Sequence, residues 1–182
     1  MNYELNLPFP RGRTACDGVN TPLAGNHEQW VGKEYLVDDS VHGTNQFVRL
    51  RACKLEANIT VARKLYKFDA DALDFGQQIA GLNDVAGGYC LALDDKYTVG
   101  DTLLANDLAW FIVDGPVSLT TELTSVSLSA HGTVVSDASG YVDGAAPAAG
   151  NHIIGRIDAA STTTNSSVVV HMSRGLAGGE GT

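Results

Sequence analysis

Short apolar segments separated by polar turns run along most of this chain. In residues 46–53, apolar Val48, Leu50 and Ala52 alternate with Phe47, Arg49 and Arg51. A period of two is typical of a β-strand with one buried face. Similar segments occur at 35–37, 59–68, 79–82, 87–93, 97–104, 110–117, 118–129, 131–136, 141–142, 153–157 and 168–172. The pattern predicts a mostly β fold, a compact barrel or sandwich of short antiparallel strands.

Two dipeptides indicate where the chain turns or bends. Asp143-Gly144 is a strong turn signal after the segment 141–142. Gly115-Pro116 interrupts the apolar segment 110–117, and proline cannot donate a hydrogen bond to a neighbouring strand. We therefore expect a turn at the first site and a break or bend in the strand at the second.

The first 29 residues differ from the rest of the chain. Prolines at positions 8, 10 and 22 disfavour helix there. Nevertheless Tyr3, Leu5, Leu7 and Phe9 alternate with polar residues or proline, as in a strand. We interpret residues 1–29 as an extended arm whose main chain pairs with the edge of another chain. A frayed terminus without a role is the alternative.

The remaining sequence predicts a simple domain plan. Residues 30–172 form one β domain, with a possible sub-boundary near 68–88, and residues 173–182 form a flexible glycine-rich tail. A chain of 182 residues is long enough to bury a hydrophobic core.

Charge is divided unevenly along the chain. Residues 1–68 hold 9 Lys/Arg and 7 Asp/Glu, whereas residues 69–182 hold 3 and 14, which together make the net charge of −9. Such an acidic chain is a poor ligand for nucleic-acid phosphates. A basic surface is possible from six residues of the first part, but no exposed aromatics are interleaved with them as in nucleic-acid binding proteins. These six are Arg49, Arg51, Lys54, Arg63, Lys64 and Lys67.

No motif in the sequence indicates catalysis or a bound cofactor. Nucleophile elbows, phosphate-binding loops and zinc-protease motifs are missing, and the five histidines are widely separated. The three cysteines lack metal-ligand spacing, so we expect buried reduced thiols. The longest apolar runs are far below the roughly 20 residues of a membrane span, and no secretion signal is recognisable. We therefore expect a non-enzymatic protein made in the cytoplasm, without cofactor, metal, membrane or nucleic-acid partner.

The order of segments in the second half resembles a known family. Tyr141 to Gly144, an Ala/Gly bridge at 145–150, Ile154-Gly155-Arg156, a polar loop and Val168 to Val170 follow one another. This order resembles the C-terminal half of the decoration, or cement, proteins of tailed-phage capsids. The segments 97–104 and 110–117, with their Gly-Asp and Gly-Pro steps, and "ARKLYKFD" at 62–69 are also similar to that family.

The resemblance implies a function as well as a fold. Members of the family bind the outer surface of the assembled head as trimers and bridge major capsid subunits. We accordingly expect a virion protein whose partners are the major capsid protein and itself, as a homotrimer. The predicted docking residues belong to the arm: Tyr3, Leu5, Leu7, Phe9, Arg11 and Arg13.

Two other classes remain open at this point. One is a head-fibre or adhesin-like β domain that binds host carbohydrate, for which Trp30 and Trp110 are the available platform aromatics. The other is a β hydrolase, for which a nucleophile motif is missing.

Overall fold

The computed structural model describes residues 6–15, 27–39, 41–43, 46–55, 57–67, 90–136, 139–144 and 153–173. The protein is mostly β, and its short antiparallel strands form an open, sandwich-like arrangement, not a closed barrel. The predicted fold class is thus confirmed as a sandwich. The predicted sub-boundary near 68–88 lies outside the described residues, as does all of the tail except Ser173.

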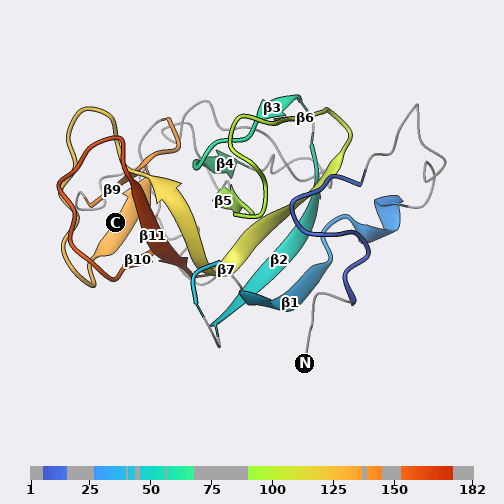
Figure 1. The fold of residues 1–182 in the computed structure, drawn as a ribbon, viewed down its shortest axis with the longest axis horizontal. Helices are drawn as coiled ribbons and strands as arrows, with labels where there is room; N and C mark the ends of the chain where they lie inside the picture. The colour runs from blue at the N-terminus through green and yellow to red at the C-terminus, as the bar shows by residue number, and fades with distance from the viewer. Residues whose placement is uncertain are drawn as a thin grey trace.

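One long strand, β7 (Leu108–Thr120), lies at the centre of the main sheet. The order in that sheet is β1-β2-β7-β11-β10-β8-β9, and β5 pairs with both β7 and β4. Figure 1 shows β1 and β2 on one side of β7 and β11 and β10 on the other. The remaining bounds are β1 Glu34–Asp39, β2 Gln46–Lys54, β4 Leu65–Lys67, β5 Cys90–Leu93, β8 Thr133–Ser136, β9 Val142–Asp143, β10 Ile153–Ile157 and β11 Ser167–Met172.

A second, two-stranded sheet and a short helix complete the described elements. Strands β3 (Ile59–Thr60) and β6 (Thr102–Leu103) pair with each other. A 3-10 helix, η2 (His27–Trp30), precedes β1.

The alternation predicted in β2 is confirmed by burial. Val48, Leu50 and Ala52 are fully buried, whereas Phe47 on the opposite face is exposed. Strand β1 pairs with β2 in an unbroken register from Glu34–Arg51 to Asp39–Gln46. Burial of one side only gives this end of the sheet a core face and an outer face.

The Gly115-Pro116 step is where β7 changes partners. Residues 108–114 pair with β2, and residues 115–120 pair with β11. Gly115 has a φ of 108°, and a side chain on it would lie 2.6 Å from the carbonyl oxygen of Phe47. Only glycine fits this conformation at this distance. The predicted interruption is therefore a bend within a continuous strand of 13 residues.

The C-terminal segments 141–144, 153–157 and 167–172 lie together in one half of the sheet. Strand β10 pairs with β11 on one side and β8 on the other, and β8 pairs with β9. Gly155 in β10 lies so close to His171 that an added Cβ would be 2.1 Å from its carbonyl oxygen. The "IIGRI" segment therefore uses its glycine for a close approach of two main chains.

The predicted strand at 118–129 is shorter than the pattern indicated. Strand β7 ends at Thr120, and Thr121 and Leu128 then make only isolated bridges, to Val142 and Ser161. Polar contacts hold this segment, because the buried Thr121 hydroxyl donates to the carbonyl oxygen of Thr163 at 2.8 Å. Side-chain hydrogen bonds of threonine compete here with strand pairing.

Candidate functional site

The described part of the predicted arm lies against its own domain. Phe9 is 6% exposed, and its ring stacks on Trp110 with the centroids 4.3 Å apart. The indole N–H of Trp110 donates to the carbonyl oxygen of Phe9 at 3.1 Å. Leu7 is partly buried against the same core. Residues 6–15 therefore do not project from the domain as an extended arm, because the aromatic core takes up their apolar side chains.

Arg11 fixes this segment with a buried ion pair. Its Nε and Nη2 atoms donate to the two carboxylate oxygens of Asp94 at 2.8 and 2.7 Å. The side chains are 3% and 0% exposed, respectively. Arg11 Nη1 also donates to the carbonyl oxygen of Asp38 at 3.1 Å. This bidentate ion pair gives both buried charges a hydrogen-bonding partner in place of water.

The six predicted docking residues therefore have different positions. Tyr3 and Leu5 lie outside the described residues. Leu7, Phe9 and Arg11 contact their own domain, as above. Arg13 has an exposed side chain, and its carbonyl oxygen accepts a hydrogen bond from the Tyr97 hydroxyl at 2.8 Å. Of the four that are described, Arg13 is the one with an exposed side chain.

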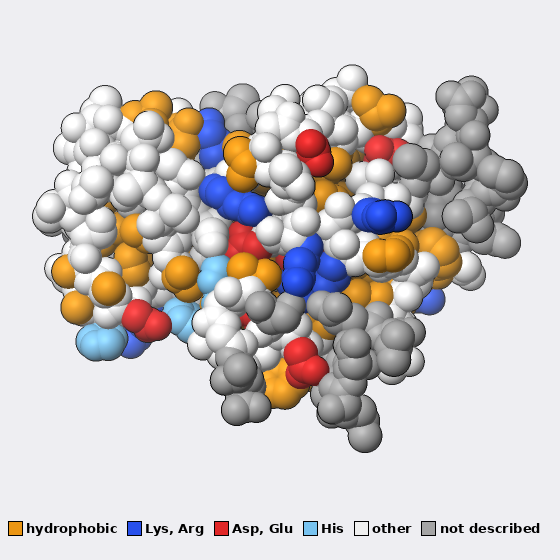
Figure 2. Space-filling view, viewed as in Figure 1, with side chains coloured by type: hydrophobic (Ala, Val, Ile, Leu, Met, Phe, Trp, Pro, Cys, Tyr) orange, Lys and Arg blue, Asp and Glu red, His pale blue; other side chains and the backbone are white. Residues whose placement is uncertain are grey.

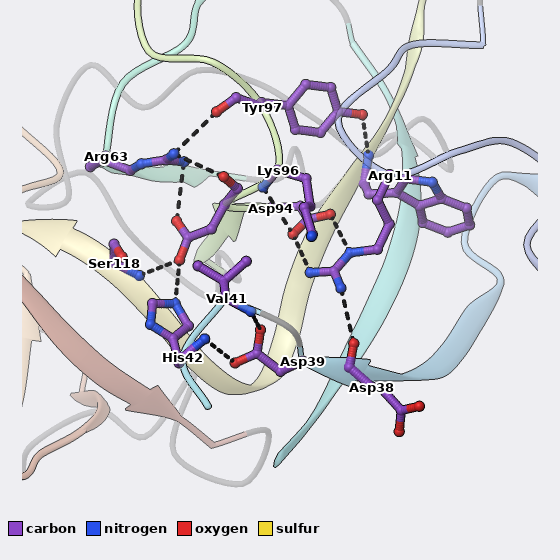
Figure 3. A network of polar contacts seen from close by, with 12 residues as sticks. Arg11, Asp38, Asp39, Val41, His42, Arg63, Asp94, Lys96, Tyr97 and Ser118 are labelled. Atoms are coloured by element: carbon purple, nitrogen blue, oxygen red, sulfur yellow. Dashed lines mark hydrogen bonds and ion pairs between the residues drawn. The ribbon is translucent and has the colours of Figure 1, made fainter. Parts of the chain in front are cut away.

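Asp95, next to Asp94, is the centre of a second polar cluster. Figure 3 labels its partners His42, Arg63 and Ser118. The Asp95 carboxylate contacts His42 Nε2 at 2.5 Å and accepts from the main-chain N–H of Ser118 at 2.7 Å. Arg63 makes an ion pair with it at 3.1 Å. These residues come from the β1–β2 connection, from β7, and from the segment before β4. The turn 94–97 thus joins the N-terminal segment and both halves of the sheet.

The Asp95 cluster has the geometry of a structural joint. A hydrolase triad needs a serine hydroxyl against the histidine, but Ser118 contributes its main-chain N–H here. Arg63 Nη2 donates to the carbonyl oxygens of Asp95 and Tyr97 at 3.0 and 3.1 Å. None of these contacts presents a nucleophile.

Cys53 is a buried free thiol, as predicted for the cysteines. Burial raises the pKa of the Cys53 thiol, more than the nearby Arg51 guanidinium lowers it. A thiol that stays protonated at neutral pH is a weak nucleophile and a poor metal ligand. Cys16 lies outside the described residues.

The predicted basic surface is dispersed in the structure. Arg51 pairs with Glu34 at 2.5 Å, Arg63 with Asp95, and the Lys64 ammonium lies 3.9 Å from the centroid of the Tyr141 ring. Figure 2 shows Lys and Arg side chains spaced in a loose row between apolar patches. Three of the six predicted basic residues, Arg51, Arg63 and Lys64, thus contact their own domain, which makes them less available to a phosphate backbone.

The outer face of β1 and β2 carries exposed apolar side chains. Leu36 is 53% exposed and Phe47 is 46% exposed, and Val41 in the following connection is 43% exposed. Register places Leu36 opposite Arg49 and Asp38 opposite Phe47, so Leu36 and Phe47 are diagonal neighbours on one face. The alternation in the sequence identified this face of the strands. It did not identify the exposure of the face, which depends on whether other elements pack against it.

A shallow, open groove of about 440 Å³ separates the N-terminal segment from β6. It is lined by Gly12, Arg13, Thr14, Tyr97, Asp101, Thr102 and Leu103. The groove is open to solvent and contains no enclosed polar centre among these residues.

Within the described ranges, no three His, Cys, Asp or Glu side chains are placed to hold a metal ion. Likewise, none of the helices in the described part of the chain has the length and apolar character to cross a membrane. Comparisons of the chain with protein-family models, curated proteins and solved structures found no match.

Proposed function

We propose that this chain is a non-enzymatic decoration protein that binds the outer surface of an assembled tailed-phage head. The observation that carries the proposal is the C-terminal half-sheet. The segments with the family's order, 141–144, 153–157 and 167–172, contain β9, β10 and β11 and share one antiparallel sheet with β8 and β7. The segments on which the sequence resemblance rests are thus neighbours in one structural unit of this chain.

The way the two half-sheets are joined also supports the proposal. A cement protein must resist forces between the subunits it bridges, so its own parts must not move apart. Strand β7 runs continuously through both halves, and the Asp95 carboxylate contacts His42 and Ser118 across the bend. Hydrogen bonds between segments that are far apart in the sequence restrain the relative movement of those segments.

The proposed protein acts as part of the virion. It is made in the host cytoplasm, associates as a homotrimer and bridges neighbouring major capsid subunits from outside. Of the predicted docking residues, Tyr3, Leu5 and Arg13 retain this proposed role, since the Phe9 and Arg11 side chains are engaged within the domain.

None of the described contacts favours the alternative function, a head fibre that binds carbohydrate. A glycan platform needs exposed aromatic faces, but Trp110 is fully buried and Trp30 packs against the core. Its ring centroid lies 6.1 Å from that of Phe9.

The test is binding to expanded, empty heads that lack this protein. Purified protein is mixed with such heads, unbound protein is removed by sedimentation, and the heads are imaged by cryo-electron microscopy. We expect density at regular outer sites and a higher disruption temperature of the decorated shell. A β protein of similar size and charge serves as control. No binding, or saturable glycan binding in place of it, would overturn the proposal.

A further inference from the structure

We draw no further inference here: the strongest candidate, the exposed apolar patch of Leu36 and Phe47 on the outer face of β1 and β2, carries nothing, because no described part of the chain shows what covers it.

Discussion

Phe9 stacks on Trp110, with ring planes 15° apart, although the two residues are 101 positions apart in the chain. Tyr35 completes the arrangement, because its ring is nearly perpendicular to that of Trp110, at a centroid distance of 5.5 Å. The N-terminal segment is consequently part of the core. Its apolar residues stabilise the domain in addition to any contact that the preceding residues make with a partner.

Replacing Phe9 with Ala should destabilise the fold strongly. The change removes a stacked, buried ring and leaves a cavity over Trp110, at a cost of about 3–5 kcal/mol. Urea unfolding followed by tryptophan fluorescence measures the effect. The control Leu123→Ala removes an exposed side chain and should change stability by less than about 0.5 kcal/mol. Equal stability of the two variants would contradict the observed stack.

The Arg11 and Asp94 side chains should be energetically coupled, so that removing both costs less than the sum of the two single removals. Arg11→Leu leaves the Asp94 carboxylate buried without its main partner, at a cost of about 3–5 kcal/mol. The double variant Arg11→Leu with Asp94→Leu removes both charges and should be less destabilised than the sum of the single variants. A double-mutant cycle on urea unfolding measures the coupling, expected at about 0.5–3 kcal/mol. Strict additivity would show that the pair contributes nothing of its own.

Stability should fall at alkaline pH because of two buried acids. Burial is the largest cause of the raised pKa of the Cys53 thiol and of the raised pKa of the Tyr97 hydroxyl. In the unfolded chain these groups lose their protons near pKa values of about 8.5 and 10. The native state keeps its protons above those values, so the free energy of unfolding decreases with rising pH, by about 1.4 kcal/mol per pH unit for each group. Their contribution is complete below about pH 8.5.

Urea titrations across the alkaline range measure this loss. Cys53→Ala should remove the part of the decrease that begins near pH 8.5 and leave the part that begins near pH 10. The comparison is internal, because Cys16 and Cys90 are the same in both proteins. A decrease identical in wild type and variant between these pH values would refute the contribution of Cys53.

Gly115→Ala should destabilise the bend of β7 more than a comparable glycine replacement elsewhere. Gly115 and Gly100 both have positive φ, of 108° and 95°. An added Cβ at Gly115 meets the Phe47 carbonyl oxygen at 2.6 Å, whereas at Gly100 nothing lies within 4 Å. Gly100→Ala therefore measures the conformational strain alone, about 1–2 kcal/mol, and the difference between the variants measures the clash. Thermal unfolding gives both, and equal values would contradict the close approach.

The sequence by itself determined the local structure well where one face of a strand is buried. Alternation identified β2 and its two faces, and the apolar segments located β10 and β11, because a period of two follows from strand geometry. The same reasoning overextended the strand after Thr120, where polar contacts of Thr121 replace pairing. The sequence also showed the Gly115-Pro116 step. It did not show that β7 changes its neighbouring strand at this step.

Only the tertiary structure decided which residues are available for contact with other molecules. The alternation of Leu7 and Phe9 is the same for a strand that pairs with a partner and for one that covers its own core. Arg11 reads as a surface charge until Asp94, 83 positions away, is placed beside it. Conversely, Leu36 is apolar and yet 53% exposed, on a strand that lies at the end of the sheet. Exposure depends on contacts between distant segments, and a local pattern of apolar and polar residues does not contain them.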